Sequence, residues 1–484
     1  MIALSAVAPT VPVDEHDADL FARLFDTWQK KQYRNLLRTV YYEGKNALRD
    51  FGIAVPPQMQ EAFTPLEWIK KGVHAVTRRS VFEGFVSSSG SDDPFGMFGI
   101  LSDNHFMEEF PQATTSSAIQ ACAFLTVTDG DVQSGEPEQL VLARSADSSA
   151  ALWDRRRRSL TGFLSIVDTD DFGPSEMVMY TPERVYSIVK NASNRWVVSW
   201  IPNRLDEVSV ARLAYLPELK RPFGHSRITR TAMGLTDAAV RTFLRAEVSA
   251  EFYMSDKYWL FGADVTKFIG DDKWSALMGR MNAIDVDTIA GEKIDIQRFT
   301  GSSPQPHVEQ MRLIQSMFAD DQNLDVKFSD ASNPSSADAI YAAKEDLIID
   351  VRDANRVWGR GAVKAFQLAV QLRDGTGMND ELRSMSAQFT DPAIVSPSAR
   401  ADAFSKLATS IDGFGSSPVG MKYAGLPLED ITQFQAWKQQ QGADDRISRL
   451  VKAAEGLRNG DAGADSAIPV GVSDAGDAGA VANS

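Results

Sequence analysis

Two helical patterns that enclose a small mixed unit are the strongest architectural signal in the sequence. The first covers residues 229–255 and contains no proline. The second covers residues 307–320 and is opened by two prolines, which favour the first turn of a helix. The unit between them is predicted as a strand, a helix and a strand at 258–261, 272–284 and 294–299. Because the connections are short, we expect a helical hairpin that carries residues 256–300 at its tip.

A very long helix follows this hairpin. Residues 321–335 are polar and show little helical pattern, whereas residues 336–372 carry apolar side chains at helical spacing. Gly359 and Gly361 interrupt that spacing, and we interpret them as a bend in the helix. The rest of the chain is predicted as a strand at 385–389, a helix at 397–411, and a helix or a broken pair of helices at 428–457.

The first half of the chain changes character near residue 80. Apolar stripes predict helices at 14–50 and 64–79. From about 80 to 220, short runs of β-branched and aromatic residues alternate with turn residues, which is typical of strands and hairpins. The expected strands are at 80–86, 119–127, 139–144, 160–167, 177–180, 185–189 and 195–200. A helix is expected at 107–120, so the chain is predicted to be of the α+β class.

The formal charge of −15 limits how the protein can meet nucleic acid. Sequence-independent clamping of nucleic acid works through Lys and Arg side chains that neutralise phosphates, and this chain carries an acidic excess. The charge still permits DNA to pass near the protein without being gripped. A content of 43% hydrophobic and 24% charged residues is that of a globular chain, and it excludes a disordered or fibrous protein.

The single cysteine and the lengths of the apolar runs indicate in which cellular compartment the protein is made. Cys122 lies in an apolar run and cannot form an intrachain disulfide, so we expect a small buried residue in a reducing compartment. No stretch reaches the roughly 18 apolar residues that span a membrane. The first twenty residues have no positive region before their short apolar stretch, which makes them a poor signal peptide.

The sequence contains no convincing catalytic site, metal site or cofactor motif. Phosphate-cradling glycine motifs are absent, and none of the five histidines forms a local ligand pair. Asp168, Asp170 and Asp171 are the densest carboxylates near strands. Such a group can hold Mg²⁺ for a metal-dependent nuclease, although the same residues are common in hairpin turns, which is the favoured interpretation. The basic run 155–158 can contact phosphate, but a solvated loop or pairing with an adjacent subunit is favoured.

Four groups of residues resemble the portal proteins of long-tailed actinobacterial phages. The segment LPELKRPFGHSRI at 216–228, followed by a helix that ends in AEFY at 250–253, carries the resemblance first. NPSSADAI at 333–340 resembles the segment ahead of that family's tunnel helix. YYEG at 41–44 with the FEGF strand at 82–85, and Asp391-Pro392 followed by RADA at 400–403, complete it. Together they span about residues 30–440.

The resemblance implies a phage-portal fold with parts named wing, stem, clip, tunnel and crown. The wing would cover residues 1–225, and the two stem helices would cover 226–255 and 303–320. Between them, 256–302 would be the clip. The tunnel loop would be 321–335 and the long tunnel helix 336–375. Residues 376–395 would return to the wing, 396–458 would form a helical crown, and 459–484 would be a disordered acidic tail.

The resemblance also implies a head–tail connector, which is not an enzyme and needs no cofactor. Its subunits would form a homo-oligomeric ring of twelve at one capsid vertex, after assembly in the host cytoplasm. The partners would be the terminase large subunit, a head-completion or adaptor protein, the major capsid protein, a scaffolding protein and double-stranded DNA in the channel, with no membrane. Expected DNA-channel residues are Arg230, Lys327, Asp330, Asn333, Ser335 and Lys344. Expected terminase- and adaptor-binding clip residues are Asp264, Lys267, Asp271, Asp272, Lys273 and Arg280.

Two other interpretations stay open at this point. The first is another capsid-associated structural or adaptor protein, which the order helix, insert, helix and long helix disfavours. A nuclease that uses Asp168, Asp170 and Asp171 would need an accompanying base. No histidine or lysine at readable spacing supplies one.

Overall fold

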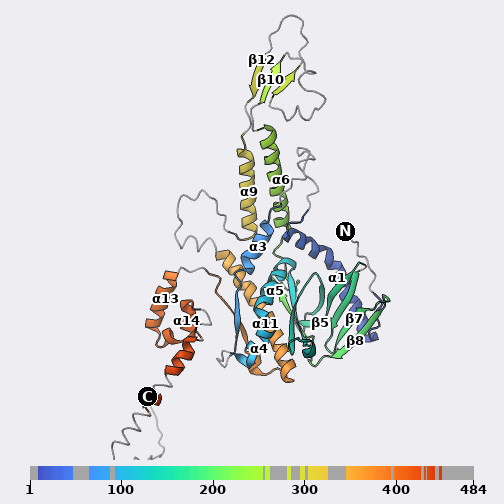
Figure 1. Cartoon of the computed structure of the whole chain (residues 1–484), viewed down its shortest axis with the longest axis vertical. Helices are drawn as coiled ribbons and strands as arrows, with labels where there is room; N and C mark the ends of the chain where they lie inside the picture. Colours follow the sequence, from blue (N-terminus) through green and yellow to red (C-terminus); the bar gives the residue numbers. More distant parts are fainter. Residues whose placement is uncertain are drawn as a thin grey trace, which may run out of the picture. The chain divides into compact units, whose positions relative to one another are not determined.

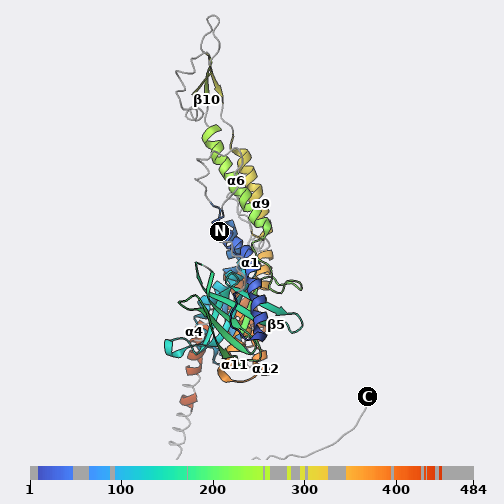
Figure 2. The same ribbon diagram turned by 90° about the vertical axis from the view of Figure 1, so that its right-hand side faces the viewer.

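The computed structural model describes most of the chain in two compact units, residues 1–394 and 395–484. The described residues are 9–46, 65–87, 93–171, 173–253, 257–261, 281–284, 295–299, 303–324, 345–393, 397–426, 430–431, 433–441 and 446–449. Figures 1 and 2 show the ribbon from two directions. The first unit contains both helices and sheets, so the predicted mixed class is confirmed.

The first unit begins with helices and continues as a long run of strands. The helices before the main sheets are α1 (Glu15–Tyr42), α3 (Trp68–Thr77), α4 (Met97–Asp103) and α5 (Phe106–Gln120), with β1 (Phe82–Val86) and the 3₁₀ turn η1 (Pro94–Gly96) between α3 and α4. The strands that follow are β2 (Cys122–Asp129), β3 (Gln139–Ser145), β4 (Ser149–Asp154), β5 (Ser159–Asp170), β6 (Gly173–Tyr180), β7 (Arg184–Lys190), β8 (Trp196–Pro202) and β9 (Val210–Ala214), with the turn η2 (Val132–Ser134) before β3.

The second half of this unit contains the helix pair and the long helix. Its elements are α6 (Arg230–Tyr253), β10 (Lys257–Phe261), β11 (Met281–Ile284), β12 (Asp295–Phe299), α9 (Gln305–Asp321), α11 (Glu345–Asp374), α12 (Asp380–Arg383) and β13 (Ser386–Phe389). Strand β13 pairs antiparallel with β1, so the chain returns after α11 to the sheet that its N-terminal part began. The strands between α6 and α9 form their own sheet in the order β11-β10-β12.

A five-stranded antiparallel sheet, β4-β5-β6-β7-β8, is covered on one face by α1. The helix buries Phe21, Phe25 and Trp28 against sheet residues that include Met179 and Tyr186. The apolar stripe seen in the sequence therefore faces the sheet, and burial of these large side chains supplies the main stabilisation of the contact.

Helix α11 forms the centre of the largest core. It packs against the three-stranded sheet β3-β2-β9 and against β13, and Trp358 and Phe366 along it are fully buried. The indole N–H of Trp358 donates to Ser117 Oγ at 3.0 Å, so this buried polar group is satisfied. The helix thereby joins α5, two sheets and the chain after it into one body (Figure 1).

Gly359 and Gly361, interpreted from the sequence as a bend, have a packing role in the structure. Helix α11 runs without interruption through both residues. A Cβ atom on Gly361 would lie 2.4 Å from the carbonyl oxygen of Arg212 in β9, and one on Gly359 would lie 2.9 Å from the ring of Phe389. The glycines therefore let two strands approach the helix closely, which periodicity along one segment does not reveal.

Most other predicted elements are found with shifted ends. Helix α1 stops at Tyr42, and a strand expected from 119 begins at Cys122 because α5 continues to Gln120. The expected helix 272–284 is wrong at its end, where Met281–Ile284 is a strand. The sequence did not predict β4, β9, α4 or α14. Residues 336–344 of the long helix and the tail 459–484 lie outside the described residues.

The second unit contains short helices. They are α13 (Pro397–Ser410), the 3₁₀ turn η3 (Phe414–Ser416) and α14 (Pro418–Ala424), and described residues between 430 and 449 are also helical. Ser417 caps α14 by accepting a hydrogen bond from the N–H of Gly420 at 3.0 Å. Phe414 packs between Phe404 and Tyr423 and holds these elements together.

Replacing Gly361 with Ala is expected to lower the free energy of unfolding by about 1–3 kcal/mol, because the new methyl group meets a backbone oxygen that cannot rotate away. Gly99→Ala is the matched control, since Gly99 lies in helix α4 with open space around it and should be neutral or slightly stabilising. Urea denaturation of the purified variants measures both values. Equal stability of the two variants would contradict the close approach.

Candidate functional site

The helices α6 and α9 form an antiparallel pair whose base is fastened to the body of the first unit (Figures 1 and 2). At the base, Thr229 Oγ1 donates to Asp321 Oδ2 at 2.9 Å, which places the start of α6 beside the end of α9. Along the pair, Ile314 and Phe318 of α9 are buried, as are Ala232 and Val240 of α6. The predicted helical hairpin is thus present, with its register set at the base.

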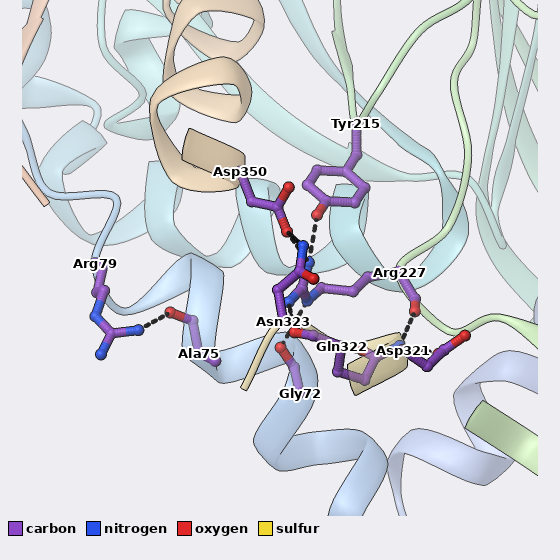
Figure 3. Close-up of polar contacts among 9 residues, drawn as sticks. All are labelled: Gly72, Ala75, Arg79, Tyr215, Arg227, Asp321, Gln322, Asn323 and Asp350. Atoms are coloured by element: carbon purple, nitrogen blue, oxygen red, sulfur yellow. Dashed lines mark hydrogen bonds and ion pairs between the residues drawn. The ribbon is translucent and has the colours of Figure 1, made fainter. Parts of the chain in front are cut away.

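Arg227, three residues before α6, is the centre of this base (Figure 3). Its side chain is 6% exposed, and its guanidinium contacts four groups from four parts of the chain. Nε donates to the carbonyl oxygen of Gly72 at 2.9 Å, and Nη1 donates to the Tyr215 hydroxyl at 2.9 Å. Nη1 also forms an ion pair with Asp350 Oδ2 at 3.1 Å, and Nη2 donates to the carbonyl oxygen of Gln322.

These partners join the helix pair to three other elements. Gly72 lies in α3, Asp350 lies in α11, and Tyr215 directly follows β9. Gln322 returns a hydrogen bond from its side-chain amide to the carbonyl oxygen of Arg227 at 3.3 Å. A buried arginine is stable only when its charge and its donors are satisfied, and here both conditions are met.

The packing around Arg227 explains two local residue choices. A Cβ atom on Gly72 would lie 2.7 Å from Gln322 Oε1, so a larger residue here would require the Gln322 side chain, which donates to the carbonyl oxygen of Arg227, to move. Tyr215 stacks on Trp358 with ring centroids 5.8 Å apart, and its burial raises the pKa of the Tyr215 hydroxyl. The hydroxyl therefore stays protonated. The contacts around Arg227 hold the helix pair in place, and we call this group of residues the Arg227 joint.

A pocket of about 770 Å³ lies beside this joint, between α3, α9 and the start of α11. Its wall from α3 and the residues after it is strongly basic. The basic or titratable lining residues are Lys70, Lys71, His74, Arg78 and Arg79. Glu67 is the one acidic residue of the lining, and Trp68, Phe318 and Leu347 supply an apolar part. The pocket is chemically suited to an anionic group, because several cations face one space.

Two groups that line this pocket have shifted pKa values, since burial lowers the pKa of Arg79 and that of His74. Partial burial lowers the pKa of His74, and the nearby charges of Arg78 and Lys70 lower it further. Its Nε2 lies 3.1 Å from the hydroxyl of Tyr42, the last residue of α1. The pocket therefore favours a neutral imidazole and leaves the positive charge to the lysines and arginines.

Of the twelve site residues expected from the sequence, only Arg230 is within the described residues. It is exposed at the first position of α6, next to the Arg227 joint. The other expected DNA-channel residues, Lys327, Asp330, Asn333, Ser335 and Lys344, lie outside the described residues. The same holds for the expected clip residues Asp264, Lys267, Asp271, Asp272, Lys273 and Arg280.

The aspartates considered for a metal site belong to a hairpin. Asp168 and Asp170 are in β5 and Asp171 is in the turn before β6. Asp170 Oδ2 forms an ion pair with Lys190 Nζ at 2.9 Å, and Asp168 Oδ2 accepts a hydrogen bond from Ser175 at 3.2 Å. Among the residues that the structure describes, no group of three or more His, Cys, Asp or Glu side chains is placed to hold a metal ion.

The basic run Arg155–Arg158 forms the turn between β4 and β5 and is solvent-exposed. Backbone N–H groups of Arg156 and Arg157 donate to Asp154 Oδ1, which fixes the turn and agrees with the favoured interpretation as a solvated loop. Cys122 is buried as expected, and burial raises the pKa of its thiol to about 12. In the described part of the chain, no helix is long and apolar enough to cross a membrane.

Sequence reasoning did not identify the Arg227 joint or the basic pocket. Gly72, Tyr215, Gln322 and Asp350 are far apart in the chain, and nothing in their local patterns connects them. The basic wall of the pocket could have been predicted, because the segment 70–79 contains five basic or titratable residues within ten positions.

Comparisons with known proteins identify one family. The family model described as phage portal protein, SPP1 Gp6-like, matches residues 23–442. The portal protein of Mycobacterium phage D29 is 23% identical over 419 residues, covering 84% of this chain and 85% of that protein. The portal protein of Mycobacterium phage L5 is 23% identical over 423 residues with the same coverage. A chain from the virion of a native gene transfer agent particle aligns with a TM-score of 0.40 and 12% identity, covering 81% of this chain and 99% of that chain.

Removing the guanidinium of Arg227 is expected to lower the free energy of unfolding by about 3–5 kcal/mol, because the Arg227→Ala change removes the ion-pair partner of Asp350, leaving it only the hydrogen bond from Asn323, and takes one donor from each of two carbonyl oxygens. Arg79→Ala is the control, since Arg79 donates only within its own helix region, to Ala75. Urea denaturation followed by tryptophan fluorescence measures the difference. A loss at Arg227 no larger than that at Arg79 would show that the joint is not a stabilising element.

The lowered pKa of His74 predicts lower stability at acidic pH. A histidine whose folded-state pKa is depressed binds fewer protons when folded than when unfolded, so its contribution to stability rises as pH increases through the window below about 6.5. His74→Gln should therefore reduce the difference in denaturation midpoint between pH 5.5 and pH 7.5. His16→Gln, at an exposed position, is the control. An unchanged pH dependence in His74→Gln would refute the prediction.

Proposed function

The chain belongs to the SPP1 Gp6-like phage portal protein family, and from this premise we propose that its subunits form a closed ring through which the phage genome enters and leaves the capsid. The observation that carries the proposal is the family match over residues 23–442, which includes every described helix and sheet of the first unit except the start of α1. The chain is a portal subunit, a structural component of the virion.

We propose that the parts of the portal correspond to the elements of this chain. The sheets and helices up to 225, with the return at 376–395, would be the wing. Helices α6 and α9 would be the stem, the β11-β10-β12 sheet would belong to the clip, and α11 would be the tunnel helix. The second unit would contain the crown. The base of the stem is the Arg227 joint, which suits a part that has to keep its angle to the wing.

The proposal includes a ring of twelve subunits at a unique capsid vertex, after assembly in the host cytoplasm. Terminase would dock on the clip and drive DNA inward, and a head-completion or adaptor protein would later take its place. The clip residues Asp264, Lys267, Asp271, Asp272, Lys273 and Arg280 stay predictions for that contact. The major capsid protein and a scaffolding protein would surround the wing.

The acidic charge of the chain supports a channel that lets DNA slide. Like charges keep the polyanion away from the wall, and few phosphates are neutralised at one time. We propose that Arg230 and the segment 321–335, with Lys327, Asp330, Asn333 and Ser335, face the channel near Lys344. Brief contacts of the basic groups with phosphates would guide the duplex without holding it.

The two competing functions have less support. A capsid or adaptor subunit would not be expected to match a portal family model over most of the chain. A nuclease at Asp168 and Asp170 would have to displace the ion pair with Lys190 and the hydrogen bond with Ser175 before it could bind Mg²⁺.

The native mass of the purified protein, together with negative-stain images of the same sample, tests the proposed function. We expect a particle of about twelve chains of 53.1 kDa with a central hole, because heterologous contacts between identical subunits close into a ring. A monomer, or a compact dimer or tetramer without a hole, would contradict the proposal.

A further inference from the structure

The side of α9 turned away from α6 carries an acidic and apolar stripe. Glu309, Leu313, Met317 and Asp320 follow one another at intervals of four, four and three residues, which places them on one face of a helix. Leu313 is 61% exposed and Met317 is 51% exposed, although neighbouring Ile314 and Phe318 are buried. Two large apolar side chains thus lie on the surface between two carboxylates.

The outward side of α6 carries a stripe of the opposite character. Arg230, Gly234, Ala238, Arg241 and Arg245 recur at intervals of four, four, three and four residues, again on one face. Gly234 has no atom within 4 Å of the place where a Cβ would lie. Glycine weakens a helix relative to alanine, and none of the described residues lies close enough to require glycine here. The stripe is therefore basic at its ends and small in its middle.

The two stripes are in register along the pair. The hydrogen bond between Thr229 and Asp321 fixes the base, so Arg230 and Asp320 lie at the same level. Arg241 is eleven residues beyond Arg230, and Glu309 is eleven residues before Asp320. At 1.5 Å per residue both pairs of charges are about 16 Å apart along the helices. Leu313 and Met317 then lie at the levels of Ala238 and Gly234.

Among the described residues, the charges of these stripes form no ion pair through Arg230, Arg241 or Asp320, although the charge of Arg241 acts on the nearby Tyr41 hydroxyl and opposes the rise that burial causes in its pKa. Glu309 accepts a hydrogen bond from Gln305 at 3.2 Å. The stripes are complementary in charge, in size and in spacing. Because they face outward from different helices of the pair, they cannot meet within one subunit.

We propose that the α9 stripe of one subunit packs against the α6 stripe of the next copy of this chain. Leu313 and Met317 would fill the space over Ala238 and Gly234, Asp320 would pair with Arg230 of the next copy, and Glu309 would pair with its Arg241. The inference rests on the proposed ring, and it names the contact that closes the ring around the stem. Such a contact joins two different surfaces of one molecule, which is the type that generates rings.

This pairing is compatible with a channel position for Arg230. A guanidinium carries five N–H donors, so a carboxylate of the next copy leaves donors free for a phosphate. The apolar middle of the stripe is more specific to a protein partner. A duplex offers phosphates to the arginines but gives no reason for exposed Leu313 and Met317 at the levels of Gly234 and Ala238.

Two charge-reversed variants test the contact. Glu309→Lys with Asp320→Lys makes both stripes basic, and Arg230→Glu with Arg241→Glu makes both acidic. Each variant alone should lose the ring and run at the mass of a single chain, because its stripes repel. An equal mixture of the two should recover rings, since every interface between unlike subunits is attractive again. Native mass spectrometry of each sample and of the mixture measures the outcome.

The controls separate this inference from the proposed function. Arg155→Glu with Arg156→Glu changes the net charge by the same amount as the second variant, but in the exposed turn between β4 and β5, and should keep the ring. Rings in wild type and in both stripe variants would overturn the contact and leave the portal function intact. Wild-type protein without rings would overturn the proposed function itself.

A crosslink provides a second measurement if a reversed variant fails to fold. The variant Gly234→Cys with Met317→Cys places the two thiols in reach of each other only across the proposed contact. Mild oxidation of assembled rings should give a ladder of covalent multimers on a denaturing gel, and either single cysteine variant should give none. Cys122 is buried and does not compete. Rings of the double variant that give no ladder would overturn the contact.

Discussion

The burial of Arg227 is the constraint on which the placement of the helix pair depends. A guanidinium with a 6% exposed side chain needs an anion and several acceptors around it, and these come from α3, the end of β9, the end of α9 and α11. Any rotation of the pair about its base would separate the arginine from at least one of them. The Arg227 joint therefore fixes the direction of α6 and α9 relative to the body of the first unit.

The sequence predicted the helices better than it predicted the contacts between them. Helices α6, α9 and α11 were predicted because their apolar residues recur at helical spacing within one segment. The packing role of Gly359 and Gly361 was not predicted for the same reason, since the strands that approach them come from residues about 25 to 150 positions away. The Arg227 joint was not predicted, because its partners at 72, 215, 322 and 350 share no local pattern.

For the candidate site, too, the sequence predicted the general function better than the individual contacts. The resemblance led to the prediction of a portal protein, which the family match supports. The acidic composition led to the further prediction that the protein binds few DNA phosphates. Individual channel and clip residues depended on resemblance alone, and of these only Arg230 is described. The basic segment that forms one wall of the pocket can be seen in the sequence, but the pocket exists only because the end of α9 and the start of α11 lie beside it. A pocket is a property of three segments together, and spacing in one of them does not reveal it.

The exposed apolar side chains of α9 and the open space at the glycine of α6 can both be understood from how a pair of helices buries its surface. A pair of helices can bury one face of each against the other, and its outer faces should then be polar if the subunit works alone. Here the outer face of α9 has large apolar residues, and the outer face of α6 has a glycine with empty space above it. Both features are unfavourable in an isolated subunit, and under the proposed contact both would become favourable when the next subunit brings one onto the other. Part of the stability of the helix pair would then come from the assembled ring, while its direction is set within each chain by Arg227.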